Sequence, residues 1–274
     1  MPNHITNIVT FTGGEERVNE LLSFVKGDES EFDFHKIAPL PTELKGTTSP
    51  TKIISQKEYD KQEKRIAKGE LTDNEKNWGL SRGLTQELAD EYRTRFGSSD
   101  WYDWQCSNWG TKWNAYEVNK YDNVVEFQTA WSTPYGILVK LSELFPDVLV
   151  SVRYSDEDFG HNVGEFDLFN GEEVNVNQPE GGSREAYELA MEIQYGGVDE
   201  YYFEDVFIEL YDDDDELTEY TQTMIDIAYD NNIFPYEDCN WHTLVLERFK
   251  EKLMEDEKYE IIAIIQKELD KVEK

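Results

Sequence analysis

Residues 101–154 read WYDWQCSNWGTKWNAYEVNKYDNVVEFQTAWSTPYGILVKLSELFPDVLVSVRY, and the other predicted elements are arranged around this stretch. Val124 to Trp131 alternates between two faces and predicts a strand. Tyr135 to Phe145 has the apolar spacing of an amphipathic helix that stops at Pro146, and Val148 to Tyr154 predicts the next strand. The first strand is expected to place on one face Val125, Phe127, Thr129 and Trp131.

The residues between that strand and helix are typical of a helix start. Ser132-Thr133-Pro134 puts a capping residue ahead of a proline in the first turn. We therefore expect a side-chain cap at this point.

Further elements precede this stretch. His4 to Thr12 is rich in β-branched and aromatic residues and predicts a strand. Glu15 to Gly27 predicts a helix, and Phe32 to Ile37 alternates like a short strand that runs into a proline turn. The apolar residues at helical spacing in the helix are Val18, Leu21, Leu22 and Val25.

The segment from about Thr42 to Ser99 is polar, lysine-rich and mixed in charge. Helical patterns occur near residues 56–68 and 84–95. Because a structureless loop of this length is uncommon in a compact domain, we expect a helical insertion between two strands.

The resulting order is strand, helix, strand, insertion, strand, helix, strand. It predicts an α+β fold, the βαββαβ antiparallel sandwich called ferredoxin-like, with helices on one face of the sheet. We expect this domain to span residues 1–176 with its insertion at about 42–99. A hairpin of 165–169 and 173–176 is expected around Asn170-Gly171.

Residues 177–183 have the composition of a linker, and residues 184–274 are expected to form an acidic, helical C-terminal region. The helices predicted there span residues 184–194, 216–231, 241–254 and 259–272. Apolar residues recur at helical spacing in the last of them.

The formal net charge is −33 and the pI is about 4.3. This charge argues against direct binding to nucleic acid or to an anionic membrane, because both require basic patches, and it favours a cationic protein surface as partner. The acidity is regional. Residues 154–247 contain one basic residue, Arg184, against 27 acidic ones, whereas residues 36–120 carry 14 basic and 13 acidic residues.

Cys106 and Cys239 are too few for a disulfide framework and fit a reducing compartment. The first residues lack a basic segment followed by an apolar run, and no apolar stretch approaches the roughly 20 residues of a membrane helix. We expect a soluble protein of the cytoplasm.

Four segments of the sequence, taken in their order along the chain, are typical of one family: MPNHITNIVTFTG, FDFHKIAPLP, NWGTKWNAY and FQTAWSTPYGILVKLSELFPD. Together they resemble the YubB-type ferredoxin-like domain family of phage, plasmid and other mobile-element proteins, over roughly residues 1–170. The resemblance implies a ferredoxin-like fold and a mobile-element origin, and it supplies no catalytic residues. Members often have an aromatic residue and a cysteine where this chain has His4-Ile5.

The box formed by residues 109–114 is the candidate contact surface. An exposed tryptophan pair flanked by Lys112 and Asn114 would stack on a ligand ring or anchor a partner protein. The structural alternative is that Trp109 and Trp113 fill the core and Asn114 caps a turn. Trp131 is a further candidate for the same surface.

An acidic run is the second candidate. Asp212, Asp213, Asp214 and Asp215 lack the glycine and the alternation of a calcium loop. They would suit a face that mimics DNA and occupies a basic groove, and the alternative is a solvated face that keeps the protein soluble.

The sequence shows no zinc spacing, nucleophile elbow or phosphate loop, so we predict no catalytic residue, metal or cofactor. The leading prediction is a non-enzymatic mobile-element accessory protein that acts by contact with another protein. A DNA mimic directed at a host nucleic-acid-binding protein is its sharper form. The alternative is a small-ligand binder or enzyme with a pocket around Trp109, Lys112, Asn114 and Trp131.

Overall fold

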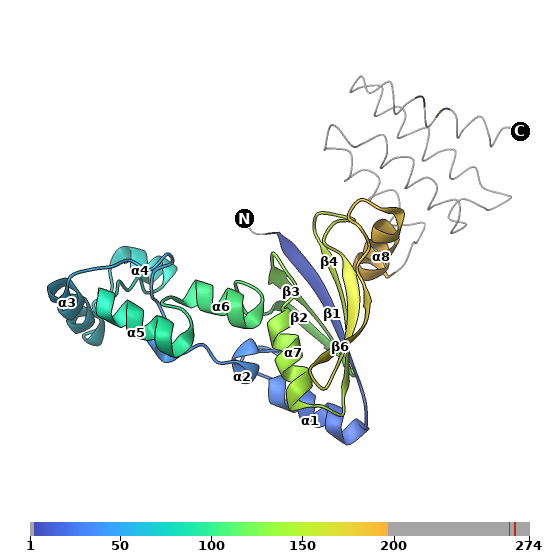
Figure 1. Ribbon diagram of the computed structural model, residues 1–274, viewed down its shortest axis with the longest axis horizontal. Helices are drawn as coiled ribbons and strands as arrows, with labels where there is room; N and C mark the ends of the chain where they lie inside the picture. The colour runs from blue at the N-terminus through green and yellow to red at the C-terminus, as the bar shows by residue number, and fades with distance from the viewer. Residues whose placement is uncertain (1–2, 197–262, 264–265, 267–274) are drawn as a thin grey trace, which may run out of the picture. The chain divides into compact units, whose positions relative to one another are not determined.

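The computed structural model describes residues 3–196, Ala263 and Gln266 (Figure 1). By its contacts the chain divides into two compact units, residues 1–152 with 166–175, and residues 153–165 with 176–274. The strands are β1 His4–Thr12, β2 Tyr116–Tyr121, β3 Val124–Ala130, β4 Leu149–Asp156, β5 Gly164–Phe169 and β6 Glu172–Asn177.

The six strands form one antiparallel sheet in the order β2-β3-β1-β4-β5-β6. β1 pairs with β3 in continuous register, from His4 opposite Ala130 to Thr10 opposite Val124. Along β1 the side chains alternate between buried and partly exposed, as expected for a sheet with one covered face. The buried side chains of β1 are Ile5, Asn7, Val9 and Phe11.

The predicted fold has two helices that follow strands along the chain. The helix α1 Glu15–Val25 follows β1, and α7 Tyr135–Leu144 follows β3. The chain order β1, α1, β2, β3, α7, β4 confirms the predicted α+β, βαββαβ arrangement. The four apolar residues predicted for α1 are all buried. Ile137, Leu138 and Leu141 of α7 are buried as well, so both helices contribute a full apolar stripe to the core.

The prediction of a strand at Phe32 to Ile37 is wrong, since Phe34–Ile37 forms the short helix α2. Asp33 caps it by accepting a hydrogen bond from the backbone N–H of His35. Phe32 and Phe34 are both fully buried, and their spacing of two residues is the same as that of buried side chains along a strand. The second strand of the fold is β2 instead, a strand that the sequence pattern did not reveal.

Pro134 occupies the N-cap position of α7, and no side chain caps this helix. The predicted capping role of the residues before it is therefore wrong. Ser132 donates its hydroxyl hydrogen to the carbonyl of Gly110 instead. The proline itself suits a helix start, because its missing N–H would have no partner there.

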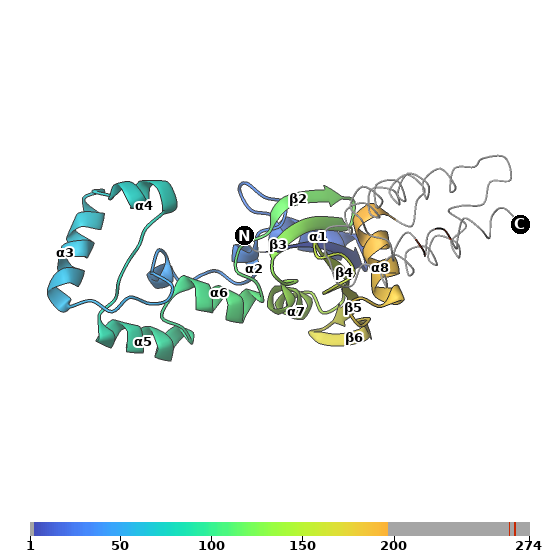
Figure 2. The ribbon, with the colours of Figure 1, turned by 90° about the horizontal axis from the view of Figure 1, so that it is seen from above.

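The insertion is helical, as predicted. It contains η1 Thr42–Leu44, α3 Gln56–Ala67, α4 Asp73–Trp78 and α5 Gln86–Phe96. Helices α3, α4 and α5 lie together as a group (Figure 2). The helix α6 Trp101–Trp109 follows them and begins at Asp100, whose side chain accepts a hydrogen bond from the N–H of Asp103.

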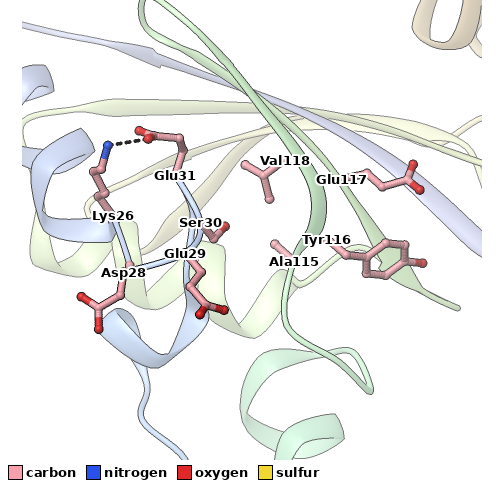
Figure 3. Close-up of a pocket in the computed structure, with 10 residues that line it drawn as sticks. Lys26, Asp28, Glu29, Ser30, Glu31, Ala115, Tyr116, Glu117 and Val118 are labelled. Atoms are coloured by element: carbon pink, nitrogen blue, oxygen red, sulfur yellow. Dashed lines mark hydrogen bonds and ion pairs between the residues drawn. The ribbon is translucent and has the colours of Figure 1, made fainter.

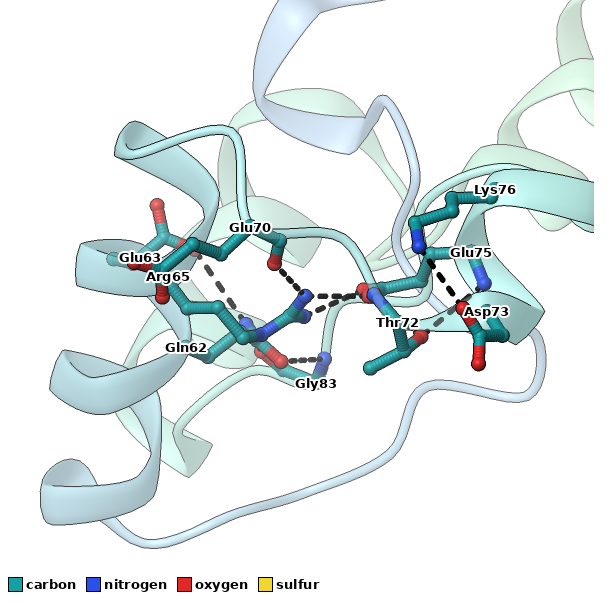
Figure 4. A network of polar contacts seen from close by, with 9 residues as sticks. All are labelled: Gln62, Glu63, Arg65, Glu70, Thr72, Asp73, Glu75, Lys76 and Gly83. Carbon is teal, nitrogen blue, oxygen red and sulfur yellow. Dashed lines mark hydrogen bonds and ion pairs between the residues drawn. The ribbon is translucent and has the colours of Figure 1, made fainter.

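One ion pair with a buried carboxylate joins two helices of the insertion (Figure 4). Arg65 of α3 donates two hydrogen bonds, of 2.5 and 2.6 Å, to the carboxylate of Glu75 in α4. The same carboxylate accepts from the backbone N–H of Thr72 and completes a capping box. These contacts lower the pKa of Glu75 to about 2, first through Arg65 and then through the Thr72 backbone.

The hairpin of β5 and β6 turns at Asn170 and Gly171, which both have positive φ as a tight two-residue turn requires. The helix predicted at 184–194 is α8 Arg184–Tyr195. In the second unit, Arg153 forms an ion pair of 2.6 Å with Glu192 of this helix.

The helices predicted at 216–231, 241–254 and 259–272 lie outside the residues that the structure describes, apart from Ala263 and Gln266. No helix in the described ranges is both long enough and apolar enough to cross a membrane.

Candidate functional site

Two backbone segments meet at the tryptophan box. Gly110 ends α6 with φ 84°, and a side chain at this position would crowd the backbone at the start of α7. Thr111 is buried and donates a hydrogen bond of 2.8 Å to the carbonyl of Ala130 at the end of β3. Together with the bond from Ser132 to Gly110, this bond fixes residues 110–113 beside residues 130–132.

Trp109 lies in the core. It is fully buried, and its indole N–H donates a hydrogen bond of 2.8 Å to the carbonyl of Ala38. Its ring contacts Phe34 edge-on, and Phe34 in turn contacts Phe127 of β3. Trp109 therefore packs against the covered face of the sheet and is inaccessible to a ligand.

Asn114 holds the start of α2. Its Oδ1 accepts hydrogen bonds from the backbone N–H groups of Phe34, at 2.9 Å, and Ala115, at 3.0 Å. Its Nδ2 donates to Oδ1 of Asp33 at 2.8 Å. These hydrogen bonds join the segment after α6 to the start of α2, which lies about 80 residues earlier in the sequence.

Lys112, Trp113 and Trp131 form a cluster at the surface. The Lys112 ammonium nitrogen lies 4.4 Å from the centre of the Trp113 ring and 4.9 Å from that of Trp131. Both distances are within the range of a cation–π interaction. Trp113 is 39% exposed and Trp131 44% exposed, so two large aromatic rings face solvent on either side of one cation.

Trp131 was expected on the same face of its strand as Phe127, and this is wrong, since Phe127 is buried and Trp131 is exposed. Its φ is 70°, in the left-handed region that bulky residues rarely adopt. Because of this backbone conformation, the Trp131 side chain does not continue the alternating pattern of β3, and its ring lies next to Lys112. A left-handed backbone at an exposed aromatic residue marks the position as a functional candidate.

Three further aromatic side chains extend the cluster. Tyr102 of α6 contacts the Trp131 ring edge-on, and Tyr116 of β2 contacts the Trp113 ring. Tyr116 also shares a hydrogen bond of 2.7 Å with Nδ1 of His4 in β1. We call these six residues the tryptophan surface: His4, Tyr102, Lys112, Trp113, Tyr116 and Trp131.

His4, Tyr102 and Tyr116 were not predicted as members of this surface. They come from β1, α6 and β2, and only the sheet register and the end of α6 bring them together. Their aromatic character was the one signal available, and it is shared by many residues of this chain.

A cleft of about 430 Å³ lies next to the box (Figure 3). It is lined by residues 26–31 and 115–118, and its acidic side chains are Asp28, Glu29, Glu31 and Glu117. Glu31 is paired with Lys26. The lining includes none of the four residues expected to form a ligand pocket, and Trp109 and Asn114 serve structural contacts.

The acidic run Asp212 to Asp215 lies outside the described residues. Within the part of the chain that the structure describes, no group of His, Cys, Asp and Glu side chains is arranged to hold a metal ion.

Comparison with known proteins gives limited matches. Residues 108–199 match the family model described as a ferredoxin-like domain in Api92-like protein. The crystal structure of a protein api92 from Yersinia pseudotuberculosis aligns at 12% sequence identity and a TM-score of 0.35, over 67% of this chain and all of that one. The search of curated proteins gave no match. The family match assigns a ferredoxin-like domain to the stretch that begins at the tryptophan box.

Proposed function

We propose that this chain is a non-enzymatic binding protein that acts by contact with another protein, and that the tryptophan surface is its contact site. The observation that carries the proposal is the position of Lys112 between two exposed tryptophan rings, 4.4 and 4.9 Å from their centres. Such rings are costly to leave in water unless something covers them.

The composition of the tryptophan surface suits protein recognition. Tryptophan and tyrosine are the residues most enriched among those that dominate binding energy, because they bury large areas with little loss of side-chain freedom. Thr111 and Ser132 hold the two segments that carry Trp113 and Trp131, so the rings are presented by a fixed backbone. A preformed contact site loses less entropy on binding.

The net charge of −33 favours a partner with a basic surface. In its sharper form, the proposal makes that partner a nucleic-acid-binding protein of a bacterial host, and the acidic run 212–215 supplies charge that stands in for phosphate. The mobile-element origin and the action in the host cytoplasm rest on the sequence resemblance of residues 1–170. We place the small-ligand or enzyme alternative second, because Trp109 and Asn114 are engaged in structural contacts.

The test is capture of proteins from a bacterial lysate on the immobilised chain, at low and at high salt, with mass spectrometry of what is retained. The decisive variant is W113A/W131A. The matched control is Y121A/F169A, which removes two aromatic side chains that are 58% and 46% exposed elsewhere on the surface. A third variant replaces residues 212–215 by asparagine.

We expect one basic protein to be retained by the wild type and by Y121A/F169A and lost with W113A/W131A. Loss of the partner at high salt and with the asparagine variant would support the DNA-mimic form of the proposal, because screening weakens charge-driven contacts. Equal retention by all variants would contradict the assignment of the tryptophan surface, and an empty column at both salts would contradict the proposed function.

A further inference from the structure

We infer that Trp113 and Trp131 form a binding site for an organic cation, and that Lys112 occupies this site in the free protein. The inference deepens the proposed function and rests on it, since it names the group that a basic partner would insert. That group is the ammonium of a lysine or the guanidinium of an arginine.

The geometry is that of an aromatic cation site. A cation within about 6 Å of a ring centre is attracted by the negative face of the ring, and tryptophan is the most effective ring. Lys112 meets this condition for two rings at once, at 4.4 and 4.9 Å. In the described part of the chain it forms no ion pair, so the two rings are its principal contacts.

The occupant is held loosely enough to leave. Lysine has a flexible four-carbon stem and a compact charge, which makes it easier to displace than a planar arginine fork. The rings remain 39% and 44% exposed while Lys112 lies between them, so an incoming cation can reach them. Lys112 thus acts as an internal competitor that keeps the site filled until a partner supplies its own cation.

Internal competition has a measurable consequence. A tethered group competes at a high effective concentration, and its removal raises the affinity for an external ligand. From the usual strength of an exposed cation–π contact, we expect removal of the Lys112 charge to tighten cation binding about two- to five-fold.

The experiment follows the indole N–H signals of the seven tryptophans by NMR during titration with tetramethylammonium chloride, against sodium chloride at equal ionic strength. The variant is Lys112→Met, which keeps the aliphatic stem and removes the charge. The control is Lys120→Met, which removes an exposed charge on β2. A second arm uses an arginine amide in place of tetramethylammonium.

We expect the Trp113 and Trp131 signals to move in a saturable way, with a midpoint about two- to five-fold lower in Lys112→Met than in the wild type or Lys120→Met. The signals of the buried Trp104 and Trp109 should stay in place. A response to arginine amide identifies a protein side chain as the ligand, whereas a response to tetramethylammonium alone would redirect the site to small quaternary amines and overturn the partner assignment.

Absence of a saturable shift in Lys112→Met would overturn the cation site. Equal midpoints in all three proteins would overturn the role of Lys112 as its occupant. Either failure leaves the proposed function intact if the W113A/W131A variant no longer captures the partner. If W113A/W131A captures the partner as well as the wild type does, the proposed function is contradicted, whatever the titration shows.

Discussion

The hydroxyl of Thr111 donates a hydrogen bond of 2.8 Å to the carbonyl oxygen of Ala130. The bond crosses from the turn after α6 to the last residue of β3, and each partner immediately precedes a member of the tryptophan surface. It therefore links the helix that carries the box to the strand end that carries Trp131.

Replacement of Thr111 by valine should loosen this surface without unfolding the domain. Valine keeps the shape of the buried side chain and removes the donor, which should lower the free energy of unfolding by about 1 kcal/mol. The indole signal of Trp131 should broaden or move, and urea denaturation gives the stability. A Trp131 signal identical to that of the wild type would show that the bond does not position the ring.

The two tryptophans of the box should respond differently to truncation. W109A removes a fully buried ring together with its hydrogen bond to Ala38, and should destabilise the protein by about 3–5 kcal/mol. W113A removes a ring that is 39% exposed and should cost clearly less, on the order of 1 kcal/mol. Similar losses in urea denaturation would contradict the division into a core residue and a surface residue.

Trp131 should be replaceable by glycine at little cost in stability. The left-handed backbone at φ 70° is strained for any residue with a Cβ atom, and glycine relieves that strain. We expect W131G to be more stable than W131A by roughly 1 kcal/mol, and both to lose partner capture. Thermal or urea denaturation of the pair measures the difference, and a less stable W131G would indicate that the backbone there is not strained.

The insertion should weaken in acid. The pKa of Glu75 in the folded chain is about 2, below its ordinary value of 4.5, so the ionised form is favoured by folding. The resulting stability is fully present above about pH 4.5 and is lost as the pH falls toward 2. Amide hydrogen exchange in α3 and α4 measures this local stability.

The variant E75Q should reduce that local stability by about 1–3 kcal/mol at pH 7, because Arg65 then lacks its carboxylate. The difference from the wild type should shrink as the pH falls through the range of the Glu75 titration. D73N is the control, since it breaks an exposed ion pair with Lys76 and should change little. A constant difference across this pH range would contradict the assigned role of Glu75.

Elements with a strong local pattern could be predicted from the sequence. The range of β1 agrees with the predicted strand, and α7 and the β5–β6 hairpin lie where apolar spacing and Asn170-Gly171 placed them. In these segments the alternation or the helical spacing reflects burial directly, because one face of each packs on the core.

The errors come from contacts that are distant in the sequence. α2 was predicted as a strand because apolar and polar residues alternate in this segment. Its helical start is held by the cap at Asp33 and by the distant Asn114, whose Oδ1 accepts a hydrogen bond from the N–H of Phe34. β2 was missed because most of its side chains are exposed and a bulge interrupts its pairing with β3.

The tryptophan surface could be predicted only in part. Lys112, Trp113 and Trp131 stood out as aromatic and charged residues near one another in the sequence. The pattern of β3 placed Trp131 on the same face as Phe127, and the positive φ of Trp131 brings its ring to Lys112 instead. The hydrophobic periodicity of a sequence does not indicate that a single residue at the end of a strand has a left-handed backbone conformation.

Photocrosslinking from the tryptophan surface in a bacterial lysate shows directly whether Trp113 lies in a contact with another protein. A photoreactive phenylalanine analogue is placed at position 113 in one protein and at position 121 in another, where the native side chain is more exposed, 58% against 39%. We predict one dominant crosslinked product, with a basic protein, from position 113 and none from position 121. Crosslinks of equal yield from both positions, or none from position 113, would contradict this prediction.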